Sequence, residues 1–365
     1  MNTKKVTVGS LLFLLIFIGA CSNDDQDGTD PAVFDDSPYT LVYEGVEDPN
    51  LNPDNPLTIE GVKLGRMLFY DARLSKDGSQ SCASCHRQEH AFTDTARFSI
   101  GVEGLKGKRQ AMSVFNTAWH SNEFFWDGRA HLLRDQAVLP IQDPLEMNES
   151  LSNVIDKLKA SEGYRNQFIR AFGSEDIDAD RIALALEQFM NSIVSFSSKY
   201  DRYLKGELSL SASEERGRVL FFAEFNPGFP NTSGADCAHC HSGSTFENDR
   251  YMNNGLSADG DYQDSGRYNV SLNPRDIGSF KVTTLRNIEL TAPYMHDGSL
   301  STLEEVIDHY NNGLEASVNL DPALEYTRVT GGLKLSSQDK ADLIAFLKTL
   351  TDQELINDPR YSDPF

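Results

Sequence analysis

The chain has 365 residues, of which 33 are basic and 55 acidic, so its formal net charge at pH 7 is −22. An excess of negative charge this large repels nucleic acid and favours a positively charged protein partner. A chain of this length suggests two domains. Charge does not determine the fold, which has to be inferred from motifs and periodicity.

The N-terminus has the features of a secretory signal. Lys4 and Lys5 precede an apolar run at residues 11–18, and small residues follow before Cys21. We therefore predict a signal peptide at residues 1–20, because the run is shorter than the ~20 apolar residues of a membrane-spanning helix. Residues 18–21 also resemble a bacterial lipobox, in which the cysteine is lipidated and becomes the mature N-terminus. The alternative is an ordinary signal peptide with a chance cysteine.

A lipid on Cys21 would anchor the protein to a bacterial membrane outside the cytoplasm, in the periplasm or at the cell surface. Residues 21–55 are polar, acidic and contain several prolines. This composition is typical of solvated linkers that bury too little apolar surface to fold. We predict that residues 21–55 form a flexible tether between the lipid and the folded part.

The other four cysteines fall in two copies of the pattern C-x-x-C-H, at residues 82–86 and 237–241. This pattern attaches c-type haem, since two thiols a helical turn apart add to the vinyl groups and the histidine ligates the iron. Zinc-binding pairs usually lie within about 20 residues of each other, whereas 151 residues separate Cys85 from Cys237. The sequence therefore predicts two covalently bound haem c groups, held by Cys82, Cys85 and His86 and by Cys237, Cys240 and His241.

An internal repeat accompanies the two motifs. The segment Gly65–Tyr70 precedes the first motif by a short loop, and Gly217–Phe222 precedes the second in the same way. We predict a mainly α-helical protein with few short strands, built from two cytochrome-c-like haem domains related by internal duplication. Their expected bounds are residues 56–205 and 206–365.

Periodicity and capping signals predict the remaining helices. They are expected at residues 150–160, 164–172, 180–197, 301–310 and 336–350, with a long loop over the second haem at residues 248–280. Three histidines have no supporting pattern and are expected to be surface or packing residues. They are His90, His120 and His131.

Between and after the motifs, two further stretches carry a specific resemblance. One comprises Phe125–Ala130, Gln136, Pro140 and Glu146, and the other comprises residues 285–287 and 291–298. With the haem motifs, they make residues 57–350 resemble the bacterial di-haem cytochrome c peroxidase family, which includes the MauG-type enzymes.

The resemblance implies roles for three residues. Glu146 matches the acid–base glutamate that moves a proton during peroxide cleavage, and Gln136 matches a glutamine that orients peroxide. Trp126 would lie between the haems and carry electrons. Without the resemblance, Glu146 would be read as a surface carboxylate and Trp126 as an aromatic core residue. Arg286 is either a haem-propionate partner or a surface residue.

Two positions depart from the well-known peroxidases. Their loop before the tryptophan carries a histidine that caps the first iron, and the matching residues 99–107 contain none. We therefore expect the first haem to be five-coordinate. Their methionine ligand of the second haem lies fourteen residues after the position of His296, where this chain has Tyr310, as MauG-type enzymes do. Tyr310 is the expected ligand, with Met252 and Met295 as rivals.

The family also holds a calcium ion through one side-chain amide and two backbone carbonyls. The matching residues are Gln110, Thr291 and Pro293. Oxygen donors suit calcium, although the family usually has the shorter asparagine in place of Gln110.

The function implied is reduction of hydrogen peroxide to water with electrons from a small redox protein, a cytochrome c or a cupredoxin. The main alternative is a MauG-like enzyme that uses a high-valent di-haem state to oxidise residues of a partner protein. A plain electron-transfer cytochrome is a third reading. Glu146 and Gln136 argue against it, because an electron carrier does not need a proton-transfer group over an open iron.

Overall fold

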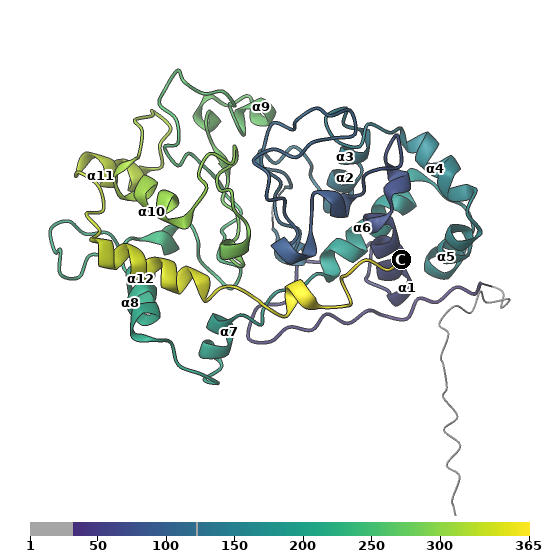
Figure 1. Ribbon diagram of the computed structural model, residues 1–365, viewed down its shortest axis with the longest axis horizontal. Helices are drawn as coiled ribbons and strands as arrows, with labels where there is room; N and C mark the ends of the chain where they lie inside the picture. Colours follow the sequence, from purple (N-terminus) through teal and green to yellow (C-terminus); the bar gives the residue numbers. More distant parts are fainter. Residues whose placement is uncertain (1–31, 122) are drawn as a thin grey trace, which may run out of the picture. The chain divides into compact units, whose positions relative to one another are not determined.

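The computed structural model describes residues 32–121 and 123–365, so the predicted signal peptide, Cys21 and the first part of the tether lie outside the described residues. The described residues form one compact, mainly helical unit (Figure 1), which confirms the predicted fold class. The boundary expected between residues 205 and 206 stays a prediction. The helices are α1 Ile59–Tyr70, α2 Leu133–Ala137, α3 Leu139–Gln142, α4 Leu151–Lys159, α5 Glu162–Phe172, α6 Ala179–Ser192, α7 Lys199–Leu204, α8 Ala212–Phe222, α9 Tyr268–Ser271, α10 Leu303–Asn312, α11 Pro322–Val329 and α12 Ser337–Lys348.

Side-chain caps set several helix ends close to the predicted ones. Ser336 and Asp339 form a capping box at the start of α12, where the last helix was expected to begin. Helix α10 begins one residue later than predicted, because Thr302 rather than Ser301 is its N-cap. Helix α6 ends five residues before the predicted Ser197, since the backbone of Ile193 and Ser195 pairs instead with Asn116.

Strands are few among the described residues. The only named sheet there pairs β1 (Tyr251–Met252) with the antiparallel β2 (Phe280–Lys281), and both lie within or beside the loop predicted at residues 248–280. None of the helices in the described part of the chain is long and apolar enough to cross a bilayer.

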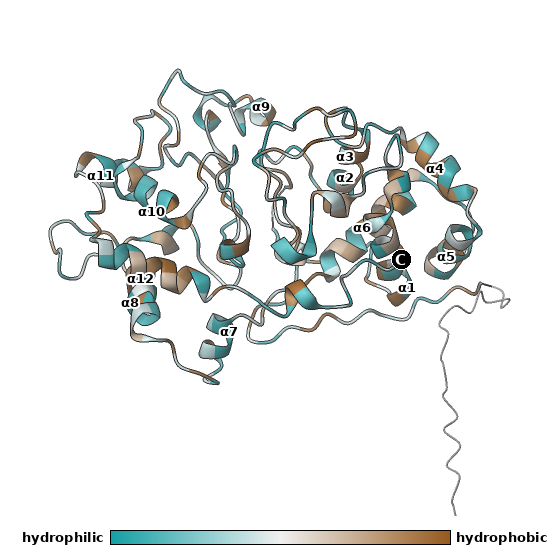
Figure 2. Ribbon diagram, viewed as in Figure 1, coloured by the Kyte–Doolittle hydropathy of each residue, from teal (hydrophilic) through white to brown (hydrophobic). Residues whose placement is uncertain are grey.

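The buried apolar side chains gather in two large clusters, each built on one helix pair. Helix α1 packs on α6 in the first cluster, and α8 packs on α12 in the second (Figure 1). Helix α12 carries both apolar and polar residues (Figure 2), and its apolar side chains Leu343 and Phe346 are buried in the second cluster.

The first glycine of each copy of the internal repeat explains why α1 packs so closely on α6 and α8 on α12. A Cβ atom at Gly65 would overlap the backbone carbonyl of Ala185 in α6. A Cβ atom at Gly217 would overlap the carbonyl of Asp342 in α12 in the same way. Each opening helix therefore needs a residue without a side chain where it crosses its partner.

The predicted tether is wrong for residues 32–55, which pack against the folded body. Tyr39 N donates to Leu57 O at 2.9 Å, and the indole of Trp119 donates to Glu47 O at 2.8 Å. The ring of Tyr43 meets that of Trp119 edge-on, with centroids 5.2 Å apart. Scattered tyrosine, leucine and valine side chains thus give this acidic segment enough apolar contact to bind.

The C-terminal segment also departs from the predicted domain bounds. Leu355 and Tyr361 belong to the first apolar cluster, not the second. Arg66 Nε donates to Ser362 O, and Tyr70 Oη donates to Tyr361 O, each at 2.6 Å. The chain therefore returns after α12 to pack on α1, because an aromatic side chain near its end fills that core.

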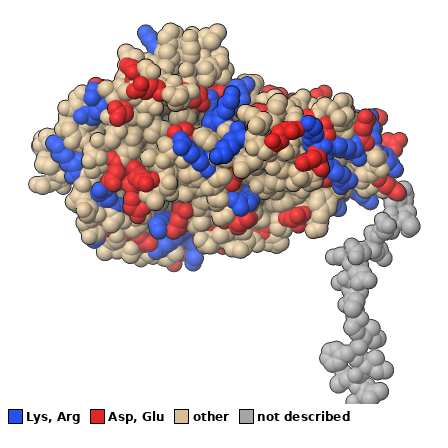
Figure 3. Space-filling model, turned by 45° about the horizontal axis from the view of Figure 1, so that its top comes forward, with Lys and Arg blue, Asp and Glu red and all other residues tan. Residues whose placement is uncertain are grey.

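Charges of both signs are interspersed on the face shown in Figure 3, where a group of basic side chains lies near the middle. The acidic excess of the chain is thus not one continuous patch on this face.

We expect Gly217→Ala to destabilise the protein by about 2 kcal/mol, because the added methyl group has no space between α8 and α12. Denaturant unfolding of the purified protein measures this change. Gly163→Ala in α5 is the control, since a Cβ atom there meets nothing nearer than Ser161 Oγ at 3.8 Å. Equal midpoints for Gly217→Ala and the unmodified protein would contradict the close-crossing argument.

Candidate active site

The first motif presents its histidine with one ring nitrogen already engaged. Residues Cys82–Ser84 form a short 3-10 turn, and His86 Nδ1 donates to Phe92 O at 2.9 Å. Burial lowers the pKa of His86, which keeps the ring neutral. With Nδ1 occupied, Nε2 is the nitrogen available to an iron.

The second motif repeats this arrangement. Cys237–His239 form the turn, and His241 Nδ1 donates to Phe246 O at 3.2 Å. Burial lowers the pKa of His241 to about 4. Phe92 and Phe246 both have left-handed backbone, with φ of 58° and 55°, which turns their carbonyls back toward the histidines.

The thiols fit covalent attachment to a porphyrin. All four cysteines of the motifs are free of disulfides, and burial raises the pKa of Cys82 and of Cys237 to about 12. Cys85 and His86 line a cavity of about 1050 Å³ that residues of both halves enclose. A half-buried pair of free thiols, a neutral histidine and an adjoining cavity are together what a c-type haem needs.

Glu146 and Gln136, the two residues expected to handle peroxide, both line this cavity. Both also line a smaller adjoining pocket with Cys82, Cys85 and His86. Burial raises the pKa of Glu146 to about 7, Asp143 adds to the shift, and Arg129 opposes it. A carboxyl group with this pKa can both accept and return a proton near neutral pH.

Trp126 is held at two points. Its indole Nε1 donates to Gln110 O, and its own carbonyl accepts from Lys281 N, both at 2.8 Å. Lys281 belongs to β2, whose other residue, Phe280, stacks on His296 with ring centroids 3.5 Å apart. Trp126 therefore lies where the chain segment that precedes α2 meets the β1–β2 sheet.

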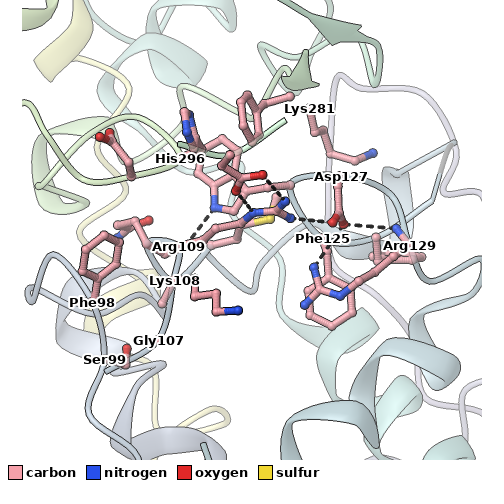
Figure 4. A pocket seen from close by; sticks show the side chains of 18 of the residues that line it. Phe98, Ser99, Gly107, Lys108, Arg109, Phe125, Asp127, Arg129, Lys281 and His296 are labelled. Atoms are coloured by element: carbon pink, nitrogen blue, oxygen red, sulfur yellow. Dashed lines mark hydrogen bonds and ion pairs between the residues drawn. The ribbon is translucent and has the colours of Figure 1, made fainter. Parts of the chain in front are cut away.

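Arg109 ties the same region together (Figure 4). Its guanidinium contacts Asp127 through Nη1 at 2.6 Å and Asp264 through Nε at 2.7 Å. Arg109 immediately precedes Gln110, whose carbonyl receives the indole N–H of Trp126. An ion pair this well buried fixes the backbone from which the Trp126 hydrogen bond is made.

The second motif has the three predicted ligand candidates near it. Asn254 Nδ2 lies 3.5 Å from Tyr310 Oη and 3.3 Å from Met295 Sδ, while Met252 Sδ lies 3.4 Å from Cys240 Sγ. Burial raises the pKa of Tyr310 to about 12. The choice of Tyr310 over the two methionines stays a prediction.

Arg286 requires a correction. Only 2% of it is exposed, so the surface alternative is wrong. Its Nη1 and Nη2 donate to the two oxygens of Asp201 at 2.9 and 2.8 Å, and Nε donates to Ser244 O. The guanidinium group expected to bind a haem propionate is thus already paired with the carboxylate of Asp201.

The predicted calcium ligands lie on adjoining segments. Gln110 N donates to His296 O at 2.8 Å, which joins it to the segment carrying Thr291 and Pro293. The side-chain Nε2 of Gln110 donates to Thr93 Oγ1 at 3.0 Å. The calcium site stays a prediction, which calcium analysis of the purified protein would test.

Sequence reasoning missed two features of this region. The sequence predicted no role for Arg109, and His120 was expected to be a surface or packing residue. His120 instead meets Glu247 and Asp249, with all three ligand atoms within 4.8 Å of one another. More than 120 positions separate His120 from these acids, so no local pattern could have indicated the contact. His131 is exposed, as predicted.

Comparison with known proteins identifies the family. A family model described as di-haem cytochrome c peroxidase matches residues 59–209. The methylamine utilization protein MauG of Methylorubrum extorquens is 39% identical over 298 residues, which are 81% of this chain and 79% of that protein. The chain belongs to the di-haem cytochrome c peroxidase family. The cytochrome c551 peroxidase of Nitrosomonas europaea is 35% identical over 303 residues, 82% of either chain.

A solved structure supports the same assignment. The crystal structure of a MauG-like protein associated with microbial copper homeostasis is 37% identical, with a TM-score of 0.79 over 88% of this chain and 98% of that one. The protein is thus a haem peroxidase of the di-haem type, an oxidoreductase, and its two motifs fit two c-type haems.

We expect the reaction of this di-haem peroxidase with peroxide to accelerate as pH rises through about 7 and then to level off. The reason is that Glu146 must be ionised to accept a proton, and its pKa is about 7. Glu146→Gln should lower the rate by about 10²–10⁴-fold and remove this pH dependence. Stopped-flow absorbance at the Soret band measures both.

Glu89→Gln is the matched control, since Glu89 is exposed and outside the cavity. A Glu146→Gln enzyme with the rate and pH profile of this control would show that another group moves the proton.

Proposed function

We propose that this di-haem peroxidase reduces hydrogen peroxide to water with single electrons from a small redox protein, a cytochrome c or a cupredoxin. The balance is H2O2 + 2e⁻ + 2H⁺ → 2H2O. The observation that carries the proposal is Glu146, a carboxyl group with a pKa of about 7 on the cavity wall beside His86.

Each residue has a task that its position supports. The haem held by Cys82, Cys85 and His86 supplies, when bound, an iron at which peroxide is activated. Glu146 accepts the proton of the nearer peroxide oxygen and returns it to the departing oxygen, which leaves as water. Gln136 lies beside it and orients peroxide through its side-chain amide.

Trp126 serves the transfer of electrons between the two haem sites. Its indole is fixed by the Gln110 carbonyl, and its backbone is fixed by Lys281. A rigid aromatic group between two redox centres needs no rearrangement when an electron passes. We place electron entry at the haem on His241 and peroxide reduction at the haem on His86.

A second candidate function is oxidation of residues in a partner protein, as the MauG resemblance implies. Two observations favour it: Tyr310 lies beside Asn254 near the second motif, and residues 99–107 contain no capping histidine. A tyrosine ligand favours ferric iron, whereas methionine favours ferrous iron. A near-infrared methionine-to-iron charge-transfer band would count against this candidate.

One experiment separates these functions. Peroxide is added to the diferric holoprotein, followed by a panel of reduced cytochromes and cupredoxins. The proposed function predicts prompt bleaching of the Soret band, recovery with at least one donor, and steady turnover. Bleaching that no donor reverses, but that decays while residues of an added protein become oxidised, supports the second candidate. If peroxide does not change the spectrum, the result supports the third reading, a plain electron-transfer cytochrome.

We also propose that Cys21 is lipidated and anchors the protein outside the cytoplasm, in the periplasm or at the cell surface. The support is the basic start, the short apolar run and the lipobox-like residues 18–21. Cys21→Ser should abolish incorporation of a labelled fatty acid and release the protein from membranes. Ser22→Ala is the control, and membrane release of that variant as well would contradict the assignment to Cys21.

A further inference from the structure

A cluster of four titratable side chains lies beside the cavity, outside the machinery described so far. His120 Nδ1 lies 3.0 Å from Asp249 Oδ1 and 3.7 Å from Glu247 Oε2. Lys281 Nζ lies 3.2 Å from the same oxygen of Asp249. His120 and Lys281 also line the cavity wall. The cluster thus joins the first half of the chain, through His120, to the second half.

Burial makes the charge state of this cluster consequential. Glu247 is only 7% exposed, and its Oε2 is a buried atom without a hydrogen-bond partner among the described residues. Asp249, by contrast, accepts from Ser121 N at 2.7 Å and pairs with Lys281. A buried carboxylate oxygen that receives no hydrogen bond is costly, so Glu247 is where a proton is most easily added.

A proton fits this site better than a metal ion. One histidine and two carboxylates are a metal-binding set in principle. Lys281, with its side chain 1% exposed, already places a positive charge on Asp249. Lys281 and Asp249 balance each other, which leaves His120 and Glu247 to share whatever proton the site holds.

The directions of the pKa shifts agree with shared protonation. Burial raises the pKa of Glu247. Burial also disfavours the charged form of His120, but Glu247 and Asp249 outweigh it and raise the pKa of His120. Burial opposes ionisation of Asp249 too, and His120 and Lys281 nevertheless hold its pKa well below its usual range.

Among the residues that the structure describes, the groups around the cluster add no further acid that faces Glu247. The side chain of Thr245, two residues before Glu247 in the chain, interacts with Glu247. The ring of Phe124 packs edge-on against the ring of His120. Tyr251 lies under Lys281 Nζ at 5.5 Å and hydrogen-bonds to Glu123, which pairs with Arg267.

Backbone connections link the cluster to the second haem site. Glu247 directly follows Phe246, whose carbonyl accepts the hydrogen bond from His241 Nδ1. Lys281 N donates to the carbonyl of Trp126. The buried carboxyl group therefore lies one residue from the support of the iron-ligating histidine, next to the residue that binds the bridging tryptophan.

We propose that His120 and Glu247 form a redox-linked proton site, which takes up one proton when the haem site on His241 accepts an electron and releases it when the electron moves on. The inference rests on the proposed electron entry at His241. In each half-cycle the donor gives one electron to the haem site. One proton from water adds to the His120–Glu247 pair, so the net buried charge does not change. Two such cycles deliver the two electrons that peroxide reduction consumes.

The physical reason is linkage. An added electron raises the proton affinity of a nearby buried group, and by reciprocity the bound proton raises the electron affinity of the haem site. The midpoint potential of that site should therefore fall as pH rises, because fewer proteins then carry the proton. If one proton is taken up per electron, the midpoint potential falls by about 59 mV for each tenfold decrease in proton concentration.

The test is spectroelectrochemistry of the holoprotein between pH 5 and pH 9. We expect the potential of the second haem site to fall with pH in the unmodified protein and in Glu224→Gln, an exposed control in the same half. We expect Glu247→Gln to flatten this dependence. A pH-independent potential in the unmodified protein, or an equal slope in Glu247→Gln, would overturn the proposal.

A second measurement does not depend on a variant. Redox-difference infrared spectra of the unmodified protein should show the carbonyl band of a protonated carboxylic acid, which appears on reduction. If this band does not appear, Glu247 is not the proton acceptor. One divalent ion per chain that is lost in His120→Ala would also overturn the proposal. Donor turnover is measured separately, so failure of the peroxidase function would leave these readouts interpretable.

Discussion

The hydrogen bond from each motif histidine to a phenylalanine carbonyl is the interaction on which the rest of the site depends. His86 and Phe92, and His241 and Phe246, make this bond in both halves of the chain. It holds each ring in one orientation and leaves the other nitrogen for the iron. The carbonyls point inward only because Phe92 and Phe246 adopt left-handed backbone, a conformation that costs energy and persists where the surroundings impose it.

That local geometry is held by the crossing of the opening helix with its partner. Phe69 of α1 packs near His86 with ring centroids 6.5 Å apart, and Phe221 of α8 packs on Phe246 at 5.9 Å. Gly65 and Gly217 bring these helices close enough for the aromatic side chains to surround the motif. Duplication of one helix–motif unit therefore explains why the same contacts occur twice.

What the sequence could predict follows from how local each signal is. The two motifs and the repeated opening helices are short-range patterns, and the structure has them in place. Glu146 and Gln136 were singled out by resemblance, and the structure places both on the wall of one cavity. The packing of residues 32–55, the return of Tyr361 to the first core and the pairing of Arg286 with Asp201 depend on contacts between distant segments. Composition alone made the first of these segments look like a linker.

The long-range contacts converge where the two halves meet. Arg109 connects Asp127 to Asp264, Trp126 is held by Gln110 and Lys281, and His120 reaches Glu247. These contacts join residues 109–127 in the first half to residues 247–281 in the second half. On the proposed path through Trp126, an electron would pass a region whose charge balance includes a buried carboxyl group. The proposed coupling of proton uptake to electron transfer follows from this, since a lone added charge in low dielectric is far more costly than a neutral pair.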